Sequence, residues 1–304
     1  MGHKRRAGPG SHPLACKVVG ASKGCLASEC YNPFALKYET LNGLTLPKIG
    51  FGTWNLGGGS SPDPRRDRLS LAALRSALEL GYTHFDTAEM YAGGHTEELL
   101  GQAVRESGAG RERLFIASKV KPEHLQPDDL LRACEGSLRR LGMDYLDLYL
   151  IHWPRPGMKL ADAFRALNRL AREAKVRHLG VSNFSLKLLK ESQALCETPI
   201  LTDQVPYSLS DRSHDTNGVL EYCQANDILL TAYSPLDQGG LHVSRKLQAV
   251  ARAHSATPHQ IALAWLAVQP HVITIPMSAD ARHQAENLAA ADIPLTGEEI
   301  RVLD

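Results

Sequence analysis

The stretch GYTHFDTAEMYAGGHTEELLGQAVRESGAGRERLFIASKV (81–120) contains the pattern that decides the fold. THFDTA and RLFIASKV are short runs rich in apolar residues, as buried strands are. Between them, TEELLGQAVRESG has the apolar spacing of a helix and ends in glycine, which commonly stops a helix. A strand, a helix and a strand in this order are the repeating unit of an α/β protein.

The same alternation continues along the rest of the chain from Lys37. Strands are expected at residues 48–53, 83–88, 113–120, 145–152, 176–183, 200–204, 228–234 and 272–276, with helices between them at residues 69–81, 96–108, 128–142, 161–174 and 257–269 among others. Eight strands in this alternation predict a (β/α)8 TIM barrel better than a doubly wound sheet. The Asn42-Gly43 turn predicts an N-terminal β-hairpin cap before the first barrel strand. No G-x-G-x-x-G motif follows an expected strand, which disfavours a Rossmann domain.

The composition excludes several classes of protein. The chain has 304 residues, 43% of them hydrophobic, and a formal net charge of +1. Residues 1–36 hold five basic residues against one acid, so the remainder carries −3 and offers no attractive field for nucleic acid. The six cysteines include no C-x-x-C pair, so neither a metal site nor a disulfide framework is indicated. No apolar run reaches the 18 residues of a membrane span.

The chain is expected to divide into an extension and one domain. Residues 1–36 lack sustained periodicity and are expected to be a disordered N-terminal extension, whereas residues 37–304 form the barrel domain. Residues 1–28 contain no Asp or Glu, which is compatible with an organelle presequence; a solvated tail or a mis-assigned start is the alternative. We expect a cytoplasmic monomer whose partner is a small molecule, not a nucleic acid or a membrane.

Four polar residues stand at or just after the ends of expected strands. Asp86 ends the second strand, Tyr91 lies in the loop after it, Lys119 ends the third strand and His152 ends the fourth. Each has an ordinary structural explanation: a turn cap, interface packing, a strand exit and a buried core histidine, respectively. In a (β/α)8 barrel, however, the carboxyl ends of the strands carry the chemistry, so these side chains are expected to converge on one catalytic rim.

The residue types at this rim suit proton transfer to a carbonyl group. A phenol has a pKa of about 10, and lowering it by about three units needs about 4 kcal/mol. An ammonium about 4 Å away supplies about 4 kcal/mol before its own desolvation is counted. Asp86 would keep Lys119 charged, and Lys119 would in turn make Tyr91 a usable acid. A neutral His152 could orient a substrate carbonyl oxygen or share the proton transfer.

The chain resembles the aldo-keto reductase superfamily over residues 37–304. The motifs that carry the resemblance are GYTHFDTAEMY, IASKV, DYLDLYLIHWP, GVSNF, DQVPYS and TAYSPL, which occur in the family's order at the expected strands. The resemblance implies reduction of aldehydes or ketones by NAD(P)H. It also implies that Tyr91 is the general acid, Lys119 and Asp86 set its pKa, and His152 orients the substrate.

The resemblance further implies a nicotinamide cofactor site. Ser182, Asn183 and Gln204 are expected to bind the carboxamide, and Tyr233 is expected to stack on the nicotinamide ring. Ser234 and Leu236 would contact the pyrophosphate, and Thr53 and Trp54 would flank the cofactor and the substrate. Phosphate or adenine contacts would come from Ser278, Glu286 and Asn287. Trp54 and Trp153 would form apolar walls of the substrate pocket, although either could be plain barrel packing. By composition alone, Ser182-Asn183 would be only a turn. No metal is implied.

Two positions depart from the pattern of NADPH-preferring members. Those members carry a Lys before the conserved Ser and an Arg six residues after that Lys, and both grip the 2′-phosphate. This chain has Met277 and His283 there, with Arg282 one residue away. Since each lost contact is worth about 1.5–3 kcal/mol, we expect NADPH use with weakened discrimination, or dual use with NADH.

The substrate range is expected to be broad and the molecules small. Family members often extend past the last helix with a tail over the pocket, whereas this chain stops at Asp304. The chain looks most like bacterial small-aldehyde, methylglyoxal or diketogulonate-type reductases. Two alternatives stay open: a cofactor-binding regulatory subunit with little turnover, and an isomerase or aldolase with Lys119 as a Schiff-base amine.

Overall fold

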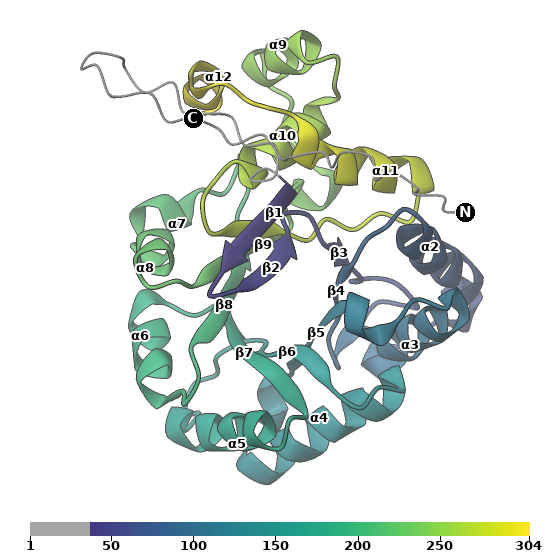
Figure 1. Ribbon diagram of the computed structural model, residues 1–304, viewed down its shortest axis with the longest axis vertical. Helices are drawn as coiled ribbons and strands as arrows, with labels where there is room; N and C mark the ends of the chain where they lie inside the picture. The colour runs from purple at the N-terminus through teal and green to yellow at the C-terminus, as the bar shows by residue number, and fades with distance from the viewer. Residues whose placement is uncertain (1–36) are drawn as a thin grey trace, which may run out of the picture. The chain divides into compact units, whose positions relative to one another are not determined.

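Eight parallel strands form the central sheet, and they follow one another in the order of the chain (Figure 1). The computed structural model describes residues 37–304, so the extension expected over residues 1–36 lies outside the described residues. The strands are β3 (Phe51–Gly52), β4 (His84–Asp86), β5 (Phe115–Val120), β6 (Leu146–Ile151), β7 (Val176–Ser182), β8 (Ile200–Pro206), β9 (Leu229–Tyr233) and β10 (Val272–Thr274). Each strand overlaps one predicted from the sequence.

Hydrogen bonds join the two outer strands, so the sheet closes into a barrel. Ile49 pairs with Thr274 in a parallel bridge. Gly50 N donates to Thr274 O at 2.8 Å, and Gly52 N donates to Pro276 O at 3.2 Å. The last strand is shorter than expected because Pro276 has no N–H to donate, although its carbonyl still accepts a bond. The predicted (β/α)8 barrel is confirmed.

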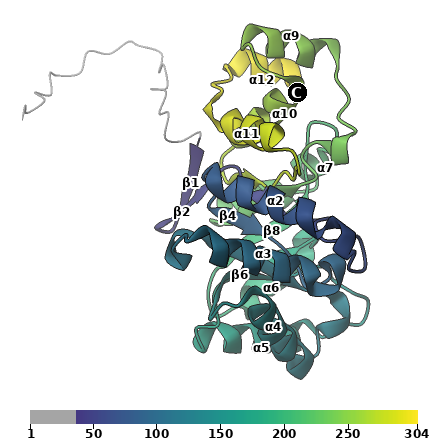
Figure 2. The same cartoon turned by 90° about the vertical axis from the view of Figure 1, so that its right-hand side faces the viewer.

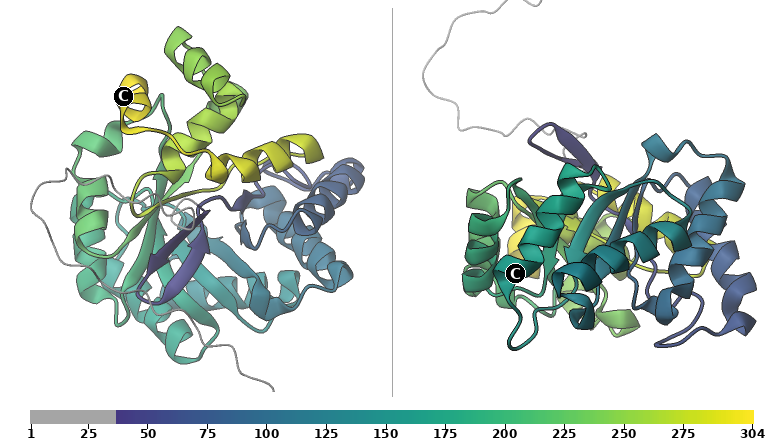
Figure 3. Two further views of the ribbon diagram at one scale, coloured as in Figure 1. Left: turned by 45° about the horizontal axis from the view of Figure 1, so that its top comes forward. Right: turned by 90° about the horizontal axis from the view of Figure 1, so that it is seen from below.

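Helices surround this barrel (Figures 1 and 3). They are α2 (Asp67–Glu79), α3 (His95–Ser107), α4 (Pro127–Leu141), α5 (Leu160–Arg172), α6 (Leu186–Leu195), α7 (Ser213–Thr216), α8 (Val219–Ala225), α9 (Arg245–Ala253), α10 (Pro258–Ala267), α11 (Ala281–Ala289) and α12 (Gly297–Leu303). In α5, Phe164 and Leu167 are buried whereas Arg165 is exposed, as the sequence spacing predicts. Within residues 37–304, no helix combines the length and apolarity that crossing a membrane requires.

A β-hairpin covers the amino-terminal end of the barrel. It consists of β1 (Tyr38–Leu41) and β2 (Leu44–Pro47), which pair antiparallel and are seen in front of the strands in Figure 1. The turn residues Asn42 and Gly43 have φ of 50° and 82°, the left-handed values that a tight hairpin turn requires. Leu41 and Leu46 pack in one cluster with Phe115, Leu148, Leu201, Leu229 and Ile273. The predicted hairpin cap is therefore confirmed.

The alternation of side chains along β5 carries a lysine into the opposite end of the barrel. Phe115 and Ala117 belong to the cluster beneath the hairpin, whereas Ile116 packs in the larger core with the helices. Because successive side chains of a strand alternate between its two faces, Lys119 shares the inner face with Phe115 and Ala117. The ammonium therefore lies inside the barrel, near the carboxyl ends of the strands.

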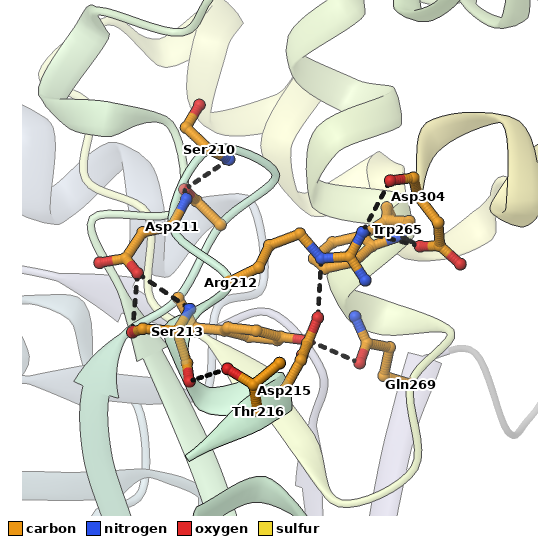
Figure 4. A network of polar contacts seen from close by, with 11 residues as sticks. Ser210, Asp211, Arg212, Ser213, Asp215, Thr216, Trp265, Gln269 and Asp304 are labelled. Atoms are coloured by element: carbon orange, nitrogen blue, oxygen red, sulfur yellow. Dashed lines mark hydrogen bonds and ion pairs between the residues drawn. The ribbon is translucent and has the colours of Figure 1, made fainter.

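A polar network ties the segment after β8 to the last helices (Figure 4). Arg212 lies between two carboxylates, with Nε 2.7 Å from Asp215 Oδ2 and Nη1 3.1 Å from Asp304 Oδ1. Trp265 Nε1 also donates to Asp304 Oδ1 at 3.2 Å, and Tyr207 Oη donates to Gln269 Oε1 at 3.0 Å. Figure 2 shows α9 and α12 at the same end of the molecule as α10. The network holds α10 and the end of α12 against the segment that follows β8.

Candidate active site

A deep cleft opens at the carboxyl ends of the barrel strands. Its volume is about 1330 Å³, larger than the cavities that usually hold drug-sized ligands. Its walls come from the loops after nearly every strand. Site residues predicted from the sequence that line it are Thr53, Trp54, Asp86, Tyr91, His152, Trp153, Asn183, Gln204, Tyr233, Ser234, Leu236, Ser278, Glu286 and Asn287.

Lys119 lies at the floor of this cleft with its side chain fully buried. Its Nζ donates to Asp86 Oδ1 at 2.5 Å, to Thr87 O at 2.9 Å and to Tyr91 Oη at 3.3 Å. Burial, the largest single effect, would lower the pKa of Lys119, but its contacts with Asp86 and Tyr91 together outweigh burial and hold the pKa above its usual value. The ammonium is therefore charged and has three acceptors.

Tyr91 is held by a tight turn, η2 (Tyr91–Gly94). Ala92, Gly93 and Gly94 have φ of 48°, 63° and 96°, so this turn needs residues that tolerate left-handed conformations. Burial raises the pKa of the Tyr91 phenol, and Lys119 opposes that rise without cancelling it. The attraction of Lys119 alone would lower the pKa of Tyr91, as expected from the sequence, but desolvation of the phenol is the larger effect in the structure. The phenol is consequently protonated at neutral pH.

His152 follows β6 and faces the phenol. Its ring lies 5.6 Å from the Tyr91 ring, centroid to centroid, at an interplanar angle of 74°. Burial, together with the positive charge of Lys119, lowers the pKa of His152 to about 2. Its Nδ1 is buried and has no hydrogen-bond partner among residues 37–304. At neutral pH this imidazole is neutral, so it can donate or accept a hydrogen bond but has no acidic proton to deliver.

The residues expected to hold the carboxamide form a connected chain that reaches the buried carboxylate. Tyr233 Oη donates to Asn183 Oδ1 at 2.8 Å, and Asn183 Nδ2 donates to Ser182 Oγ at 2.9 Å. Ser182 Oγ donates to Gln204 O at 2.8 Å, and Gln204 Nε2 donates to Asp86 Oδ2 at 2.9 Å. Both oxygens of Asp86 therefore have a donor. The sequence did not predict the Gln204–Asp86 contact, since the two residues are distant along the chain.

The residues Thr53, Trp54 and Trp153, which follow β3 and β6, differ in how far their side chains are exposed. Thr53 is buried, and its hydroxyl donates to Asp86 O at 2.9 Å. Trp54 and Trp153 are 45% and 44% exposed and line the cleft, so neither is packed inside the barrel. The two tryptophans therefore line the cleft, and their role as walls of a substrate pocket stays a prediction.

The far end of the cleft contains the residues that depart from the family pattern. Met277 is exposed, and it lines the cleft with His283 and Arg282. Arg282 Nη2 lies 3.2 Å from His283 Nε2, and its Nε lies 3.9 Å from Glu286 Oε1. A cationic side chain is thus retained beside the position where His283 replaces an arginine.

Several other polar residues of the cleft were not identified from the sequence, and three of them follow the strands that carry Asp86 and Lys119. They are Glu89, Lys121 and His124, which line the cleft beside Tyr91. Lys121 and His124 follow the Lys119 strand in the stretch SKVKPEH, and Glu89 stands two residues before Tyr91. Their position directly after strand ends was the signal that could have identified them.

The residues present fit a nicotinamide dinucleotide. Asn183 and Gln204 line the cleft, and the buried Ser182 hydroxyl accepts from Asn183 behind them, so this part of the cleft offers the donors and acceptors that a carboxamide needs. Arg282 and Ser278 stand at the other end, where they suit phosphate oxygens. Among residues 37–304, no group of three or more His, Cys, Asp or Glu side chains is arranged to hold a metal ion.

Residues 48–304 match the Aldo/keto reductase family. The chain therefore belongs to this family, as the sequence motifs predicted. The protein is accordingly an NAD(P)H-dependent oxidoreductase that acts on aldehydes and ketones.

Curated relatives and solved structures agree with this assignment. The chain is 36% identical over 270 residues to methylglyoxal reductase YeaE of Escherichia coli K12, covering 86% of this chain and 91% of that protein. It is 35% identical over 263 residues to glyoxal reductase of Bacillus subtilis 168, covering 86% and 90%. A crystal structure of the thermostable aldo-keto reductase Tm1743 with epalrestat has a TM-score of 0.85 and 46% identity, covering 88% and 98%. A Klebsiella pneumoniae aldo/keto reductase with NADP and acetate has a TM-score of 0.79 and 38% identity, covering 88% and 94%.

Proposed function

We propose that this protein reduces small reactive aldehydes and dicarbonyls, methylglyoxal among them, with NADPH as reductant and Tyr91 as proton donor. The observation that carries the proposal is the contact of 3.3 Å between Tyr91 Oη and Lys119 Nζ at the floor of the cleft. The Asp86 carboxylate keeps that ammonium charged. A charged donor fixed beside a protonated phenol is an arrangement for delivering a proton to a developing oxyanion.

The phenol, not the imidazole, is the acid in this scheme. A neutral His152 with a pKa of about 2 carries no acidic proton at neutral pH, whereas the Tyr91 phenol is protonated. The alkoxide that forms on carbonyl reduction is a far stronger base than a phenolate, so transfer from Tyr91 is downhill even with a raised pKa. Lys119 then stabilises the phenolate, and His152 orients the carbonyl oxygen by a hydrogen bond.

Residues on both sides of the barrel mouth would hold the cofactor, which supplies a hydride when it is bound. Carboxamide binding falls to Ser182, Asn183 and Gln204, and Tyr233 offers its ring for stacking. Thr53, Trp54, Ser234 and Leu236 border the same part of the cleft, and Ser278, Glu286 and Asn287 lie at its far end. Weak discrimination between NADPH and NADH is part of the proposal, because Met277 and His283 provide no fixed cation.

The proposal that the substrates are small is supported by the named relatives and by the residues that line the cleft. Two of the named relatives are a methylglyoxal reductase and a glyoxal reductase. The exposed tryptophans Trp54 and Trp153 offer flat apolar walls beside Tyr91 and no enclosed side-chain pocket. We further propose that the protein acts as a monomer in the cytoplasm, through the domain formed by residues 37–304.

The two alternative functions find no support in the structure. Lys119 is fully buried, charged and bound to Asp86, so its amine is not available for attack on a carbonyl carbon as a Schiff-base lysine must be. The named relatives are reductases and lend nothing to the alternative of a regulatory subunit.

The decisive experiment measures cofactor oxidation with aldehydes, ketones and dicarbonyls under both NADPH and NADH. Tyr91→Phe should lower kcat by about a hundredfold to ten-thousandfold, the usual contribution of a general acid, while cofactor affinity stays within about twofold. Tyr222→Phe, on α8, is the matched control and should keep full activity. Absence of turnover by the wild-type protein with all substrates, despite cofactor binding, would refute the proposal in favour of a regulatory subunit.

A further inference from the structure

A histidine next to the turn that carries Tyr91 is bound by carboxylates at both ring nitrogens. His95 is the first residue of α3 and directly follows η2. Its Nε2 lies 2.8 Å from Asp67 Oδ1, in the first turn of α2, and its Nδ1 lies 2.8 Å from Glu98 Oε2, in the first turn of α3. The imidazole is 19% exposed. We call Asp67, His95 and Glu98 the helix bridge.

The geometry of the helix bridge suits a charged imidazole. A neutral ring has one N–H and one acceptor nitrogen, so a neutral His95 would place a lone pair against a carboxylate oxygen. An imidazolium donates from both nitrogens. Burial, the largest single effect, would lower the pKa of His95, but the contacts with Glu98 and Asp67 together outweigh burial and hold the pKa above its usual value of about 6.5. The charge is therefore lost only as the pH rises through this raised pKa.

Two carboxylates, one from each helix, set the charge of this imidazole. Among residues 37–304, Asp67 and Glu98 are the charged groups in contact with His95. Two nearby acids are already paired with arginines: Asp63 with Arg65, and Glu97 with Arg140. Two arginines flank Asp67 in the chain, and both are exposed: Arg66 and Arg68. The loop after β3 presents backbone to the ring, since a Cβ added at Gly57 would lie 3.1 Å from His95 Cδ2.

That loop connects α2 with the turn η2. Gly57 N donates to Ser70 Oγ of α2 at 2.8 Å, whereas Gly59 O accepts from Ala92 N of η2 at 3.0 Å. A shift of α2 relative to α3 would therefore draw the loop away from one of these two partners. The turn would then lose part of its support.

His95 joins the same parts directly. Its backbone N donates to Ala92 O, so His95 ends the turn as it begins α3. Tyr91 is the first residue of this turn and precedes Ala92. The ion pair with Asp67 adds α2 to this unit. The phenol, the turn, the loop and the two helices are thus held together at one imidazole.

We propose that His95 is a positioning residue for Tyr91: its imidazolium ties α2 to α3 and so keeps the phenol where it can deliver a proton. This inference rests on the proposed carbonyl reduction. His95 lies outside the lining of the cleft and acts through the turn. Because proton transfer depends steeply on geometry, loss of the imidazolium slows the chemical step.

The test measures NADPH oxidation in a single turnover with methylglyoxal, between about pH 6 and about pH 9.5. His95→Gln keeps one donor and one acceptor but has no charge at any pH. The ratio of the wild-type rate to the His95→Gln rate should be about tenfold at the acid end and should approach one at the alkaline end. Titrations of other groups are common to both proteins and cancel in this ratio.

Two further variants separate the charge from simple packing. Asp67→Asn should lower the rate at about pH 6 as His95→Gln does, and the double variant should be no slower, because both changes break the same contact. Glu98→Gln removes one of the carboxylates that raise the pKa of His95, so its alkaline decline should begin at a lower pH than in the wild type.

His254→Gln is the matched control. His254 of α9 has its Nε2 2.8 Å from Glu299 Oε1 of α12 and is 18% exposed, so it also joins two helices through a carboxylate. Neither residue lines the cleft. This substitution should lower Tm but leave the single-turnover rate equal to that of the wild type at every pH.

A second readout does not depend on turnover. In NMR spectra of isotopically labelled histidine, the His95 signals, assigned by their loss in His95→Gln, should show two protonated ring nitrogens at about pH 6.5. They should titrate where the rate ratio falls. An uncharged ring at about pH 6.5, a rate ratio that is the same at every pH, or equal rate losses in His254→Gln would overturn the positioning role, while wild-type turnover still supports carbonyl reduction. No wild-type reduction of any aldehyde, ketone or dicarbonyl would instead contradict the proposed function, on which the role of His95 rests.

Discussion

At the scale of single residues, Asp203 is a buried acid that the proposed chemistry does not use. Asp203 lies in β8 and is fully buried, and its contact with the protein is a long hydrogen bond of 3.5 Å from Phe184 N. Its Oδ2 has no partner among residues 37–304. Burial raises the pKa of Asp203 to about 8, so the carboxyl group is mostly neutral in the folded protein at pH 7.

This residue should destabilise the protein as the pH rises. The unfolded chain ionises Asp203 above pH about 4, whereas the folded chain resists ionisation up to pH about 8, so the free energy of unfolding falls across that interval. Asp203→Asn removes the titration and keeps the shape. We expect the variant to be about 2–4 kcal/mol more stable than the wild type at pH 8, with little difference at pH 4. Urea denaturation at both pH values measures this, and an equal effect at the two would contradict it.

The cofactor preference also depends on single residues. Met277→Lys and His283→Arg each add a fixed cation at the far end of the cleft, next to Arg282. Each should raise the ratio of NADPH to NADH affinity by about tenfold or more, since charged contacts to phosphate are worth about 1.5–3 kcal/mol. Fluorescence titration with both nucleotides gives the ratio. His242→Arg, an exposed site outside the cleft, is the control, and a matching rise there would point to a nonspecific charge effect.

The sequence predicted the types of the site residues better than their contacts. Asp86, Tyr91, Lys119 and His152 were identifiable because polar side chains at strand ends are unusual, and the structure places them together. The bond between Gln204 and Asp86 and the contacts of Glu89 with Lys121 and His124 were not predicted, since each joins residues that are distant in the sequence. Their functional roles stay predictions until the variants are measured.

At the scale of elements, an ion pair between a buried glutamate and a partly exposed arginine supports the turn that carries Tyr91. Glu97 of α3 is fully buried, and it accepts from Ser118 Oγ at 2.5 Å and from Arg140 Nε at 2.6 Å. Arg140 of α4 in turn packs against Gly94, the last residue of η2. Three elements thus meet behind the turn, and their contacts limit how far the phenol can move.

Gly94→Ala should disturb this junction. A Cβ at Gly94 would lie 2.6 Å from Arg140 Nε, and the backbone has φ of 96°. We expect a loss of about 1–3 kcal/mol in the free energy of unfolding, together with a lower kcat because Tyr91 shifts.

Gly108→Ala is the matched control for this variant. Gly108 also has positive φ, at 67°, but no atom lies within 4 Å of an added Cβ. It should cost about 1 kcal/mol or less and leave kcat unchanged. Equal losses of kcat in the two variants would show that backbone strain, not the arginine contact, explains the effect. Kinetics and thermal denaturation on both proteins provide the comparison.

At the scale of the whole molecule, the alternation of strands and helices was sufficient to predict the barrel, because each unit needs its neighbours to bury both faces of the sheet. Strand limits were less predictable. The expected strand at residues 48–53 is reduced to Phe51–Gly52, since the backbone around Ile49 and Gly50 pairs across the closing edge with β10 instead. The pairing of the first and last strands, which closes the barrel, depends on the complete sheet and cannot be predicted from any single segment.

That closing edge has a consequence for the lifetime of the folded state. The pairs Ile49–Thr274 and Gly52–Pro276 join residues more than 200 positions apart, so closing this seam has a large loop-closure entropy cost. We therefore expect the seam to form late in folding. The proposed cofactor residues stand on both of its sides, Thr53 and Trp54 on one and Ser278 on the other. A nucleotide held between them would stabilise the closed seam. The reduced cofactor that drives the reaction would therefore also slow unfolding of the enzyme.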